Sequence, residues 1–159
     1  MDSIIVVSNL TKTYQTQKAV NDISFAVKEG SLFAFLGTNG AGKSTTIEIL
    51  CTLLKKSSGQ VIINGYNLDQ NNEGNIRKSI GVVFQQSILD DRLTVEENIL
   101  HRGKMYGLTT EELKENYAFV TKYLQLEEIA PRKYRQLSGG QRRRADIARA
   151  LIHRPKILF

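Results

Sequence analysis

One stretch of the sequence combines closely spaced glycines with a lysine and hydroxyl residues, a set of groups suited to binding phosphate. It fits the pattern G-x-x-x-x-G-K-[ST] and consists of Gly37, Thr38, Asn39, Gly40, Ala41, Gly42, Lys43, Ser44 and Thr45. Glycines let backbone N–H groups turn inward onto an anion, because no Cβ stands in the way. Lys43 is placed to reach the β- and γ-phosphates, and the Ser44 hydroxyl suits Mg²⁺. The pattern predicts a loop that binds a nucleotide through its phosphates.

A second glycine pair lies at the start of a predicted helix, in the sequence Ser138-Gly139-Gly140-Gln141. Ser138 as the N-cap and Gln141 three residues later form a capping box. Two glycines in a first helical turn cost up to about 1 kcal/mol each relative to alanine. The arginines at 142–144 also oppose the helix dipole, which prefers acids at this end. An anion approaching the helix would explain both choices, although the arginine run taken alone is more simply a solvated basic surface.

The phosphate loop requires a strand before it and a helix after it, and the sequence predicts both. Residues 32–36 (LFAFL) are apolar at every position, which is typical of a strand buried on both faces of a mostly parallel sheet. Gly59 is available to end the helix that follows. The apolar face of this helix consists of Ile47, Leu50, Cys51 and Leu54.

The rest of the chain alternates between strand and helix patterns. Short β-branched or apolar runs predict strands at residues 4–7, 23–27, 60–63 and 80–84, with a hairpin-type turn at Asn64-Gly65. Thr94 with Glu97 and Thr109 with Glu112 match the capping box and predict two helices, the first closed by Gly107. A third helix is expected from near Gly139 to Ile152. These elements predict an α/β layout with an inserted helical subdomain.

Composition places the chain among soluble globular proteins. Its 159 residues are 41% hydrophobic and 24% charged, with one cysteine and a formal net charge of +6. These fractions exclude collagen-like, disulfide-rich and disordered classes. No run approaches the ~18 apolar residues of a membrane span. The positive charge permits nucleic acid, anionic lipid or nucleotide phosphates as partners and does not choose among them.

The motif LSGGQ at residues 137–141, downstream of GTNGAGKST, resembles the signature of ABC-type ATP-binding cassettes, the nucleotide-binding subunits of ABC transporters. The resemblance covers the whole chain and includes the continuation RRRADIARALIHRPKILF. It implies a P-loop NTPase fold with a RecA-like core of the ABC type and an N-terminal antiparallel β portion. It also implies one incomplete nucleotide-binding domain, with residues 1–90 and 154–159 in the α/β core and residues 91–153 in the helical subdomain.

The resemblance implies ATP and Mg²⁺ as ligands. In the family, two cassettes face each other, and ATP is held between the phosphate loop of one chain and the signature of the other. This arrangement implies ATP contacts for Ser138, Gly139, Gly140 and Gln141 across such a pair.

Two further residues acquire roles from the resemblance. Tyr14 lies upstream of the loop, in KTYQTQKAV, where the family has an aromatic residue that stacks on adenine. Gln85 in GVVFQQ resembles the Q-loop glutamine, which approaches Mg²⁺ and the attacking water; it is chosen over Gln86 because it directly follows the apolar strand. Lys43 and Gln85 are therefore the catalytic candidates, and Ser44 and Gln85 are the candidate groups for Mg²⁺.

The function implied is that of the ATP-binding subunit of a membrane transporter that couples ATP binding and hydrolysis to substrate movement. Export is favoured, because residues 85–100 resemble cassettes of drug- or polysaccharide-exporting systems. The implied partners are a second nucleotide-binding domain and a transmembrane permease, which would hold the chain in the cytoplasm at the inner face of the cell membrane; no nucleic acid is expected. Two alternatives stay open: a soluble ABC-type ATPase acting on the ribosome or DNA, and a nucleotide-binding fragment without hydrolysis.

Hydrolysis in this family needs acidic residues that the 159 residues do not include. In the family, the Walker B aspartate and the glutamate after it follow an apolar run, and here such a run begins at residues 156–159. Walker B, the D-loop and the switch histidine are therefore expected beyond Phe159. Residues 1–159 alone are expected to bind ATP without turning it over, because Mg²⁺ lacks a carboxylate and the attacking water lacks an orienting base.

The phosphate loop generates a direct test. Replacing Lys43 with alanine removes the cation that faces the β- and γ-phosphates, so ATP binding should weaken by at least ~1.5–3 kcal/mol, the scale of a charged hydrogen bond. Equilibrium titration of both forms with a fluorescent ATP analogue measures the difference. Equal affinities would contradict the assignment of this loop.

Overall fold

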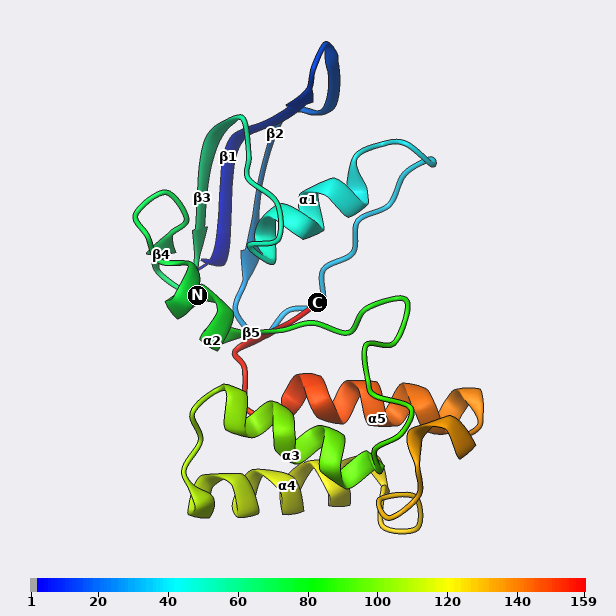
Figure 1. Ribbon diagram of the computed structural model, residues 1–159. Helices are drawn as coiled ribbons and strands as arrows, with labels where there is room; N and C mark the ends of the chain where they lie inside the picture. Colours follow the sequence, from blue (N-terminus) through cyan, green and yellow to red (C-terminus); the bar gives the residue numbers. More distant parts are fainter. Residues whose placement is uncertain (1–2) are drawn as a thin grey trace. The chain divides into compact units, whose positions relative to one another are not determined.

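The computed structural model describes residues 3–159, which form two compact units (Figure 1). The first unit ends at Ser79 and the second is Ile80–Phe159. Tyr14 and the phosphate loop belong to the first unit, whereas Gln85 and the signature residues belong to the second. The predicted assignment of residues 80–90 and 154–159 to one core with the first unit stays a prediction.

The first unit is built on an antiparallel sheet, as predicted, with the strand order β2-β1-β3-β4. In β1, Ile5 and Val7 are buried while the residues between and beside them are less covered, the alternation of a strand with one face on a core. Both residues of the Asn64-Gly65 turn have positive φ, 49° and 78°, which confirms the predicted hairpin turn. The strands are β1 (Ser3–Tyr14), β2 (Gln17–Lys28), β3 (Ser58–Ile63) and β4 (Tyr66–Asn67).

Two helices complete the first unit, α1 (Lys43–Leu50) and α2 (Glu73–Ser79). Helix α1 is shorter than predicted, because Thr52 adopts a left-handed conformation with φ 61° and turns the chain before Leu54. The prediction that Gly59 ends this helix is wrong. Gly59 lies in β3 with φ 90°, where a Cβ would overlap the Asn9 carbonyl. Cys51 is buried as expected of a packing residue, and burial, followed by the charge of Glu48, raises the pKa of its thiol to about 12.

The prediction of a buried strand at residues 32–36 is wrong in this structure. The segment has no regular secondary structure, and the Leu32 and Leu36 side chains are 101% and 91% exposed. A strand inside a parallel sheet needs hydrogen-bonding neighbours along both edges, and no strand within residues 3–159 pairs with this segment. Its aromatic residues pack on β2 instead: the Phe33 and Phe35 rings lie 5.5 and 5.1 Å from the ring of Phe25.

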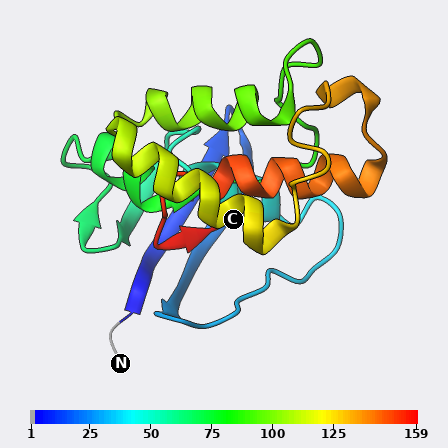
Figure 2. The ribbon, with the colours of Figure 1, turned by 90° about the horizontal axis from the view of Figure 1, so that it is seen from below.

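The second unit joins a short parallel strand pair to three long helices. Strands β5 (Ile80–Gly81) and β6 (Ile157–Leu158) pair in parallel, and the ladder continues with Phe159 N–H donating to the Gly81 carbonyl at 2.8 Å. The strand predicted at residues 80–84 is thus present in its first half. The helices pack against one another (Figure 1, Figure 2) and are α3 (Val95–Met105), α4 (Thr110–Leu124) and α5 (Gly139–Leu151). Their shared core includes Val95, Ile99, Val120, Leu126, Ala148 and Ile152.

Side-chain caps fix where these three helices begin, and all three predicted capping boxes are confirmed. At α3, the Glu97 N–H donates to Thr94 Oγ1 at 3.1 Å and the Thr94 N–H donates to Glu97 Oε2 at 2.7 Å. These backbone donors lower the pKa of the Glu97 carboxyl, and Thr109 does the same for Glu112. Gly107 follows α3 with φ 75°, the conformation expected of a closing glycine. Within residues 3–159, none of the helices has both the length and the apolar character needed to cross a bilayer.

Candidate nucleotide-binding site

The phosphate loop is held in shape by a close approach between its backbone and strand β2. Gly40 and Gly42 adopt positive φ values of 84° and 80°. A Cβ at Gly42 would overlap the carbonyl oxygen of Ala19 and crowd the Val20 side chain at 3.2 Å. Both the conformation and the space therefore require glycine at position 42.

The first turn of α1 has no side-chain cap, in contrast to α3, α4 and α5. Its N-cap is Gly42, no side chain among residues 3–159 caps its first N–H groups, and the first turn carries no acid. The N–H groups of Lys43, Ser44 and Thr45 have no partner within the helix, because a helix leaves its first N–H groups unbonded. The first intrahelical bond runs from the Thr46 N–H to the Gly42 carbonyl at 2.9 Å. Amide dipoles and a lysine at the same helix end favour an anion.

The Lys43 ammonium lies over the loop rather than in open solvent. Its Nζ donates to the carbonyls of Gly37 and Thr38, each at 2.6 Å. An ammonium has three N–H donors, so one stays available for a phosphate oxygen after these two bonds. The Ser44 side chain is exposed beside it. This set of donors fits a nucleotide phosphate together with Mg²⁺, whose ligands are commonly phosphate oxygens, waters and one or two side chains.

Tyr14 is the last residue of β1, and its side chain is 46% exposed. The Lys12 Nζ lies 4.9 Å from the centre of the Tyr14 ring, and the same ammonium donates to the Lys55 carbonyl at 2.8 Å. A cation fixed over one face of the ring leaves the other face for a base. The environment therefore fits the predicted stacking role.

Gln85 lies in the irregular segment after β5, and its side chain is exposed. The carbonyl of the preceding residue, Phe84, accepts a hydrogen bond from Arg143 Nη1 at 2.8 Å. Gln85 is therefore attached through its neighbour to helix α5, which begins at the signature.

The signature residues form the capping box of α5. The Ser138 N–H donates to Gln141 Oε1 at 2.9 Å, and the Gln141 N–H donates to Ser138 Oγ at 3.4 Å. Gly139 and Gly140 are exposed, and a Cβ at either position would meet no atom within 4 Å. Packing within this chain gives no reason for glycine at these two positions, so the open space is suited to contact with another molecule.

The arginines after the signature donate to backbone carbonyls, and Arg143 is also exposed to solvent, as the run alone suggested. Arg142 Nε donates to the Leu137 carbonyl at 3.2 Å. Arg144 Nη1 donates to the Gln125 carbonyl at 2.9 Å, at the end of α4. These arginines hold the segments on either side of α5, a role that the sequence did not reveal because a charge run says nothing about distant carbonyls.

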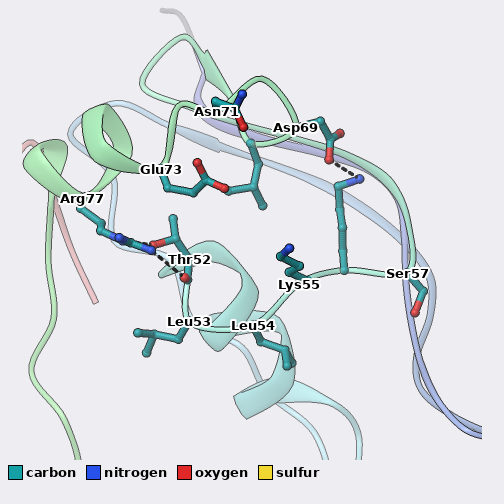
Figure 3. A pocket seen from close by; sticks show the side chains of 11 residues that line it. Thr52, Leu53, Leu54, Lys55, Ser57, Asp69, Asn71, Glu73 and Arg77 are labelled. Carbon is teal, nitrogen blue, oxygen red and sulfur yellow. Dashed lines mark hydrogen bonds and ion pairs between the residues drawn. The ribbon is translucent and has the colours of Figure 1, made fainter.

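A cleft of about 540 Å³ lies elsewhere in the first unit, between the segment after α1 and the segment that leads into α2 (Figure 3). Two of its cations are already bound: Lys56 pairs with Asp69 at 2.8 Å, and Arg77 Nε donates to Thr52 Oγ1 at 2.6 Å. No residue of the phosphate loop lines it. The bonds of its lining residues hold the chain segment after α1, and the cleft does not extend the candidate site.

No group of three or more His, Cys, Asp or Glu side chains among residues 3–159 is arranged to hold a metal ion.

Comparison with known proteins gives consistent matches. A family model described as "ABC transporter" matches residues 20–159. The linearmycin resistance ATP-binding protein LnrL of Bacillus subtilis is 41% identical over 151 residues, covering 95% of this chain and 48% of LnrL. The doxorubicin resistance ATP-binding protein DrrA of Mycobacterium tuberculosis is 38% identical over 160 residues, covering 99% of this chain and 48% of DrrA. The chain thus spans about half the length of these curated relatives.

Solved structures match over nearly the whole chain. The cbiO1 protein of Clostridium perfringens, part of the ABC transporter complex cbiONQ, has a TM-score of 0.89 with 29% identity, covering 99% of this chain and 64% of cbiO1. A dimeric, post-hydrolysis structure of the ATP-binding cassette MJ0796, bound to ADP and Pi, has a TM-score of 0.82 with 34% identity, covering 97% of this chain and 72% of that one.

The exposed ring of Tyr14 generates a prediction about base stacking. Tyr14→Phe should bind ATP nearly as tightly as the unmodified chain, because the aromatic face is kept, whereas Tyr14→Ala should lose about 1–3 kcal/mol. Titration with a fluorescent ATP analogue measures both. Tyr66→Ala is the matched control, because Tyr66 is also an exposed strand tyrosine, at 38%. If Tyr14→Ala binds as tightly as Tyr14→Phe, the tyrosine has no stacking role.

Proposed function

The chain belongs to the ABC transporter family, and on this premise we propose that it is the ATP-binding part of a transporter that couples ATP binding and hydrolysis to substrate movement across a membrane. The observation that carries the proposal is the phosphate loop, where an uncapped helix start and the Lys43 ammonium meet. A basic group and unbonded amides at a helix start are unfavourable for the helix itself. They suit a bound polyphosphate.

The residues of the site take distinct roles in this proposal. Lys43 and the amides at the start of α1 bind and orient the β- and γ-phosphates, and Ser44 contributes its hydroxyl to Mg²⁺, which when bound neutralises charge on the phosphates. Tyr14 stacks on the adenine. Gln85 orients the attacking water and approaches Mg²⁺ through its amide oxygen. It does not act as the base, because a neutral amide does not accept a proton at pH 7.

A second nucleotide-binding domain completes the site in this proposal. The exposed glycines 139 and 140 would receive the γ-phosphate of ATP held by the other domain, which explains residues that packing within the chain does not require. The dimeric form of the similar cassette MJ0796, bound to ADP and Pi, supports such a pairing. The two domains are either two copies of this chain or one copy with a different cassette.

The transport partner in this proposal is a transmembrane permease that holds the chain at the cytoplasmic face of the membrane. Export is the proposed direction, supported by two drug-resistance ATP-binding proteins at 41% and 38% identity, whereas the phosphonates import protein PhnC of Treponema denticola matches at 37%. The substrate would then be a compound that the cell removes. Nucleic acid has no role in this function.

The signature glycines test the proposal through opposite effects on stability and turnover. Gly140→Ala should raise the free energy of unfolding by up to about 1 kcal/mol, because alanine favours the helix and the space beside it is open. The same change should reduce ATP hydrolysis by the full-length gene product, because the added methyl group stands where phosphate approaches. Urea unfolding and phosphate release measure the two effects.

Gly107→Ala is the control for this experiment, since position 107 has φ 75° and alanine there should destabilise the chain. Full ATP turnover by the stabilised Gly140→Ala protein would contradict a role for the signature in hydrolysis.

A further inference from the structure

Three charged side chains lie on one face of α5 at a spacing of three residues: Arg143, Asp146 and Arg149. Each contacts the irregular segment after β5. Arg149 Nη2 donates to the Val82 carbonyl at 2.7 Å, Arg143 Nη1 donates to the Phe84 carbonyl at 2.8 Å, and Ser87 Oγ donates to Asp146 Oδ1 at 2.6 Å. We call these three side chains the α5 polar face. Its contacts lie on both sides of Gln85 along the chain.

Asp146 is the central member of this face and is 7% exposed. Besides the bond from Ser87, the Tyr134 hydroxyl lies 3.4 Å from each of its carboxylate oxygens, and Tyr134 is itself 2% exposed. A buried carboxylate is costly unless hydrogen bonds and nearby positive charge compensate it. Arg149, which is 4% exposed, provides such a charge. Asp146 therefore does not serve to keep the helix soluble; its buried carboxylate holds the side chains around it in place.

The segment that the polar face contacts has no secondary structure of its own. After the Val83 N–H donates to the Phe159 carbonyl at 2.8 Å, the parallel ladder stops, and no helix begins before Val95. Side-chain contacts therefore decide the path of residues 84–87. Because Gln85 is exposed and irregular, its amide would sample many positions without them.

We propose that Asp146 is a positioning residue: together with Arg143 and Arg149 it fixes residues 82–87 on α5 and thereby sets where the Gln85 amide lies. The inference rests on the proposed function, in which Gln85 orients the attacking water.

The first measurement is hydrogen exchange of the backbone amides in residues 82–88. Asp146→Leu and Ser87→Ala each remove the bond between Asp146 and Ser87, and both should speed exchange in this segment by about tenfold, the effect of losing one hydrogen bond to a charged group. Asp146→Asn keeps an acceptor oxygen for Ser87 and should exchange like the unmodified chain. Asn116→Leu is the matched control, because Asn116 is equally buried at 8% and bonds to Arg154 instead.

The second measurement is steady-state ATP hydrolysis by the full-length gene product carrying the same substitutions. Asp146→Leu and Ser87→Ala should lower kcat by about tenfold with KM unchanged, since the phosphate loop is intact and only the orientation of the water suffers. Asp146→Asn should restore kcat, and Asn116→Leu should leave it unchanged. Ser87→Ala keeps the test decisive if Asp146→Leu fails to fold, because Ser87 is at the surface.

The outcomes separate the two proposals. Unchanged exchange in residues 82–88, or faster exchange with an unchanged kcat, overturns the positioning role and leaves the proposed function intact. Absence of ATP hydrolysis in the unmodified full-length protein overturns the proposed function and the positioning role with it.

Discussion

The carbonyl of Ala19 and the backbone of Gly42 approach so closely that no side chain fits between β2 and the start of α1. This contact attaches the phosphate loop to the antiparallel sheet and fixes the direction in which α1 begins. Because Gly42 is the N-cap, the helix starts without a side chain that could cap it, and its first amides stay available. The binding capacity of the loop thus follows from a steric constraint on one residue. The fold accepts an uncapped helix at this position and at the same time places Lys43 over the loop.

The other long helices begin differently from α1. Helices α3, α4 and α5 each begin with a complete capping box. At α5 the box coexists with two exposed glycines, so the helix start is stabilised by Ser138 and Gln141 while residues 139 and 140 stay open. The chain therefore has two glycine-rich helix starts that differ. The start of α1 has no side-chain cap and lies beside the Lys43 ammonium, whereas the start of α5 is capped and exposed to solvent. This difference fits a loop that holds the nucleotide and a signature that meets it from another domain.

Local signals predicted much of this structure, and long-range contacts account for what they missed. Thr94, Thr109 and Ser138 predicted the starts of their helices, because a capping box involves only four consecutive residues. Asn64-Gly65 predicted its turn for the same reason. The segment LFAFL was predicted as a buried strand because its composition is that of one, yet a strand also needs neighbours, and within residues 3–159 it has none. The roles of Arg143, Asp146 and Arg149 depend on residues about sixty positions away, so no local signal in the sequence revealed them. For the candidate site, the motif predicted the loop and its lysine, whereas the contact of Gly42 with Ala19 required the fold.

The central claim is that the unbonded amides at the start of α1 bind nucleotide phosphate. Amide resonances of the chain, followed by NMR during titration with MgATP, test this claim directly. We expect large downfield shifts of the amide protons of Gly40, Gly42, Lys43, Ser44 and Thr45, as these groups donate to phosphate oxygens. The capped first turns of α3 and α4 should show no such change. Saturable MgATP binding that leaves the α1 amides unshifted would contradict the account.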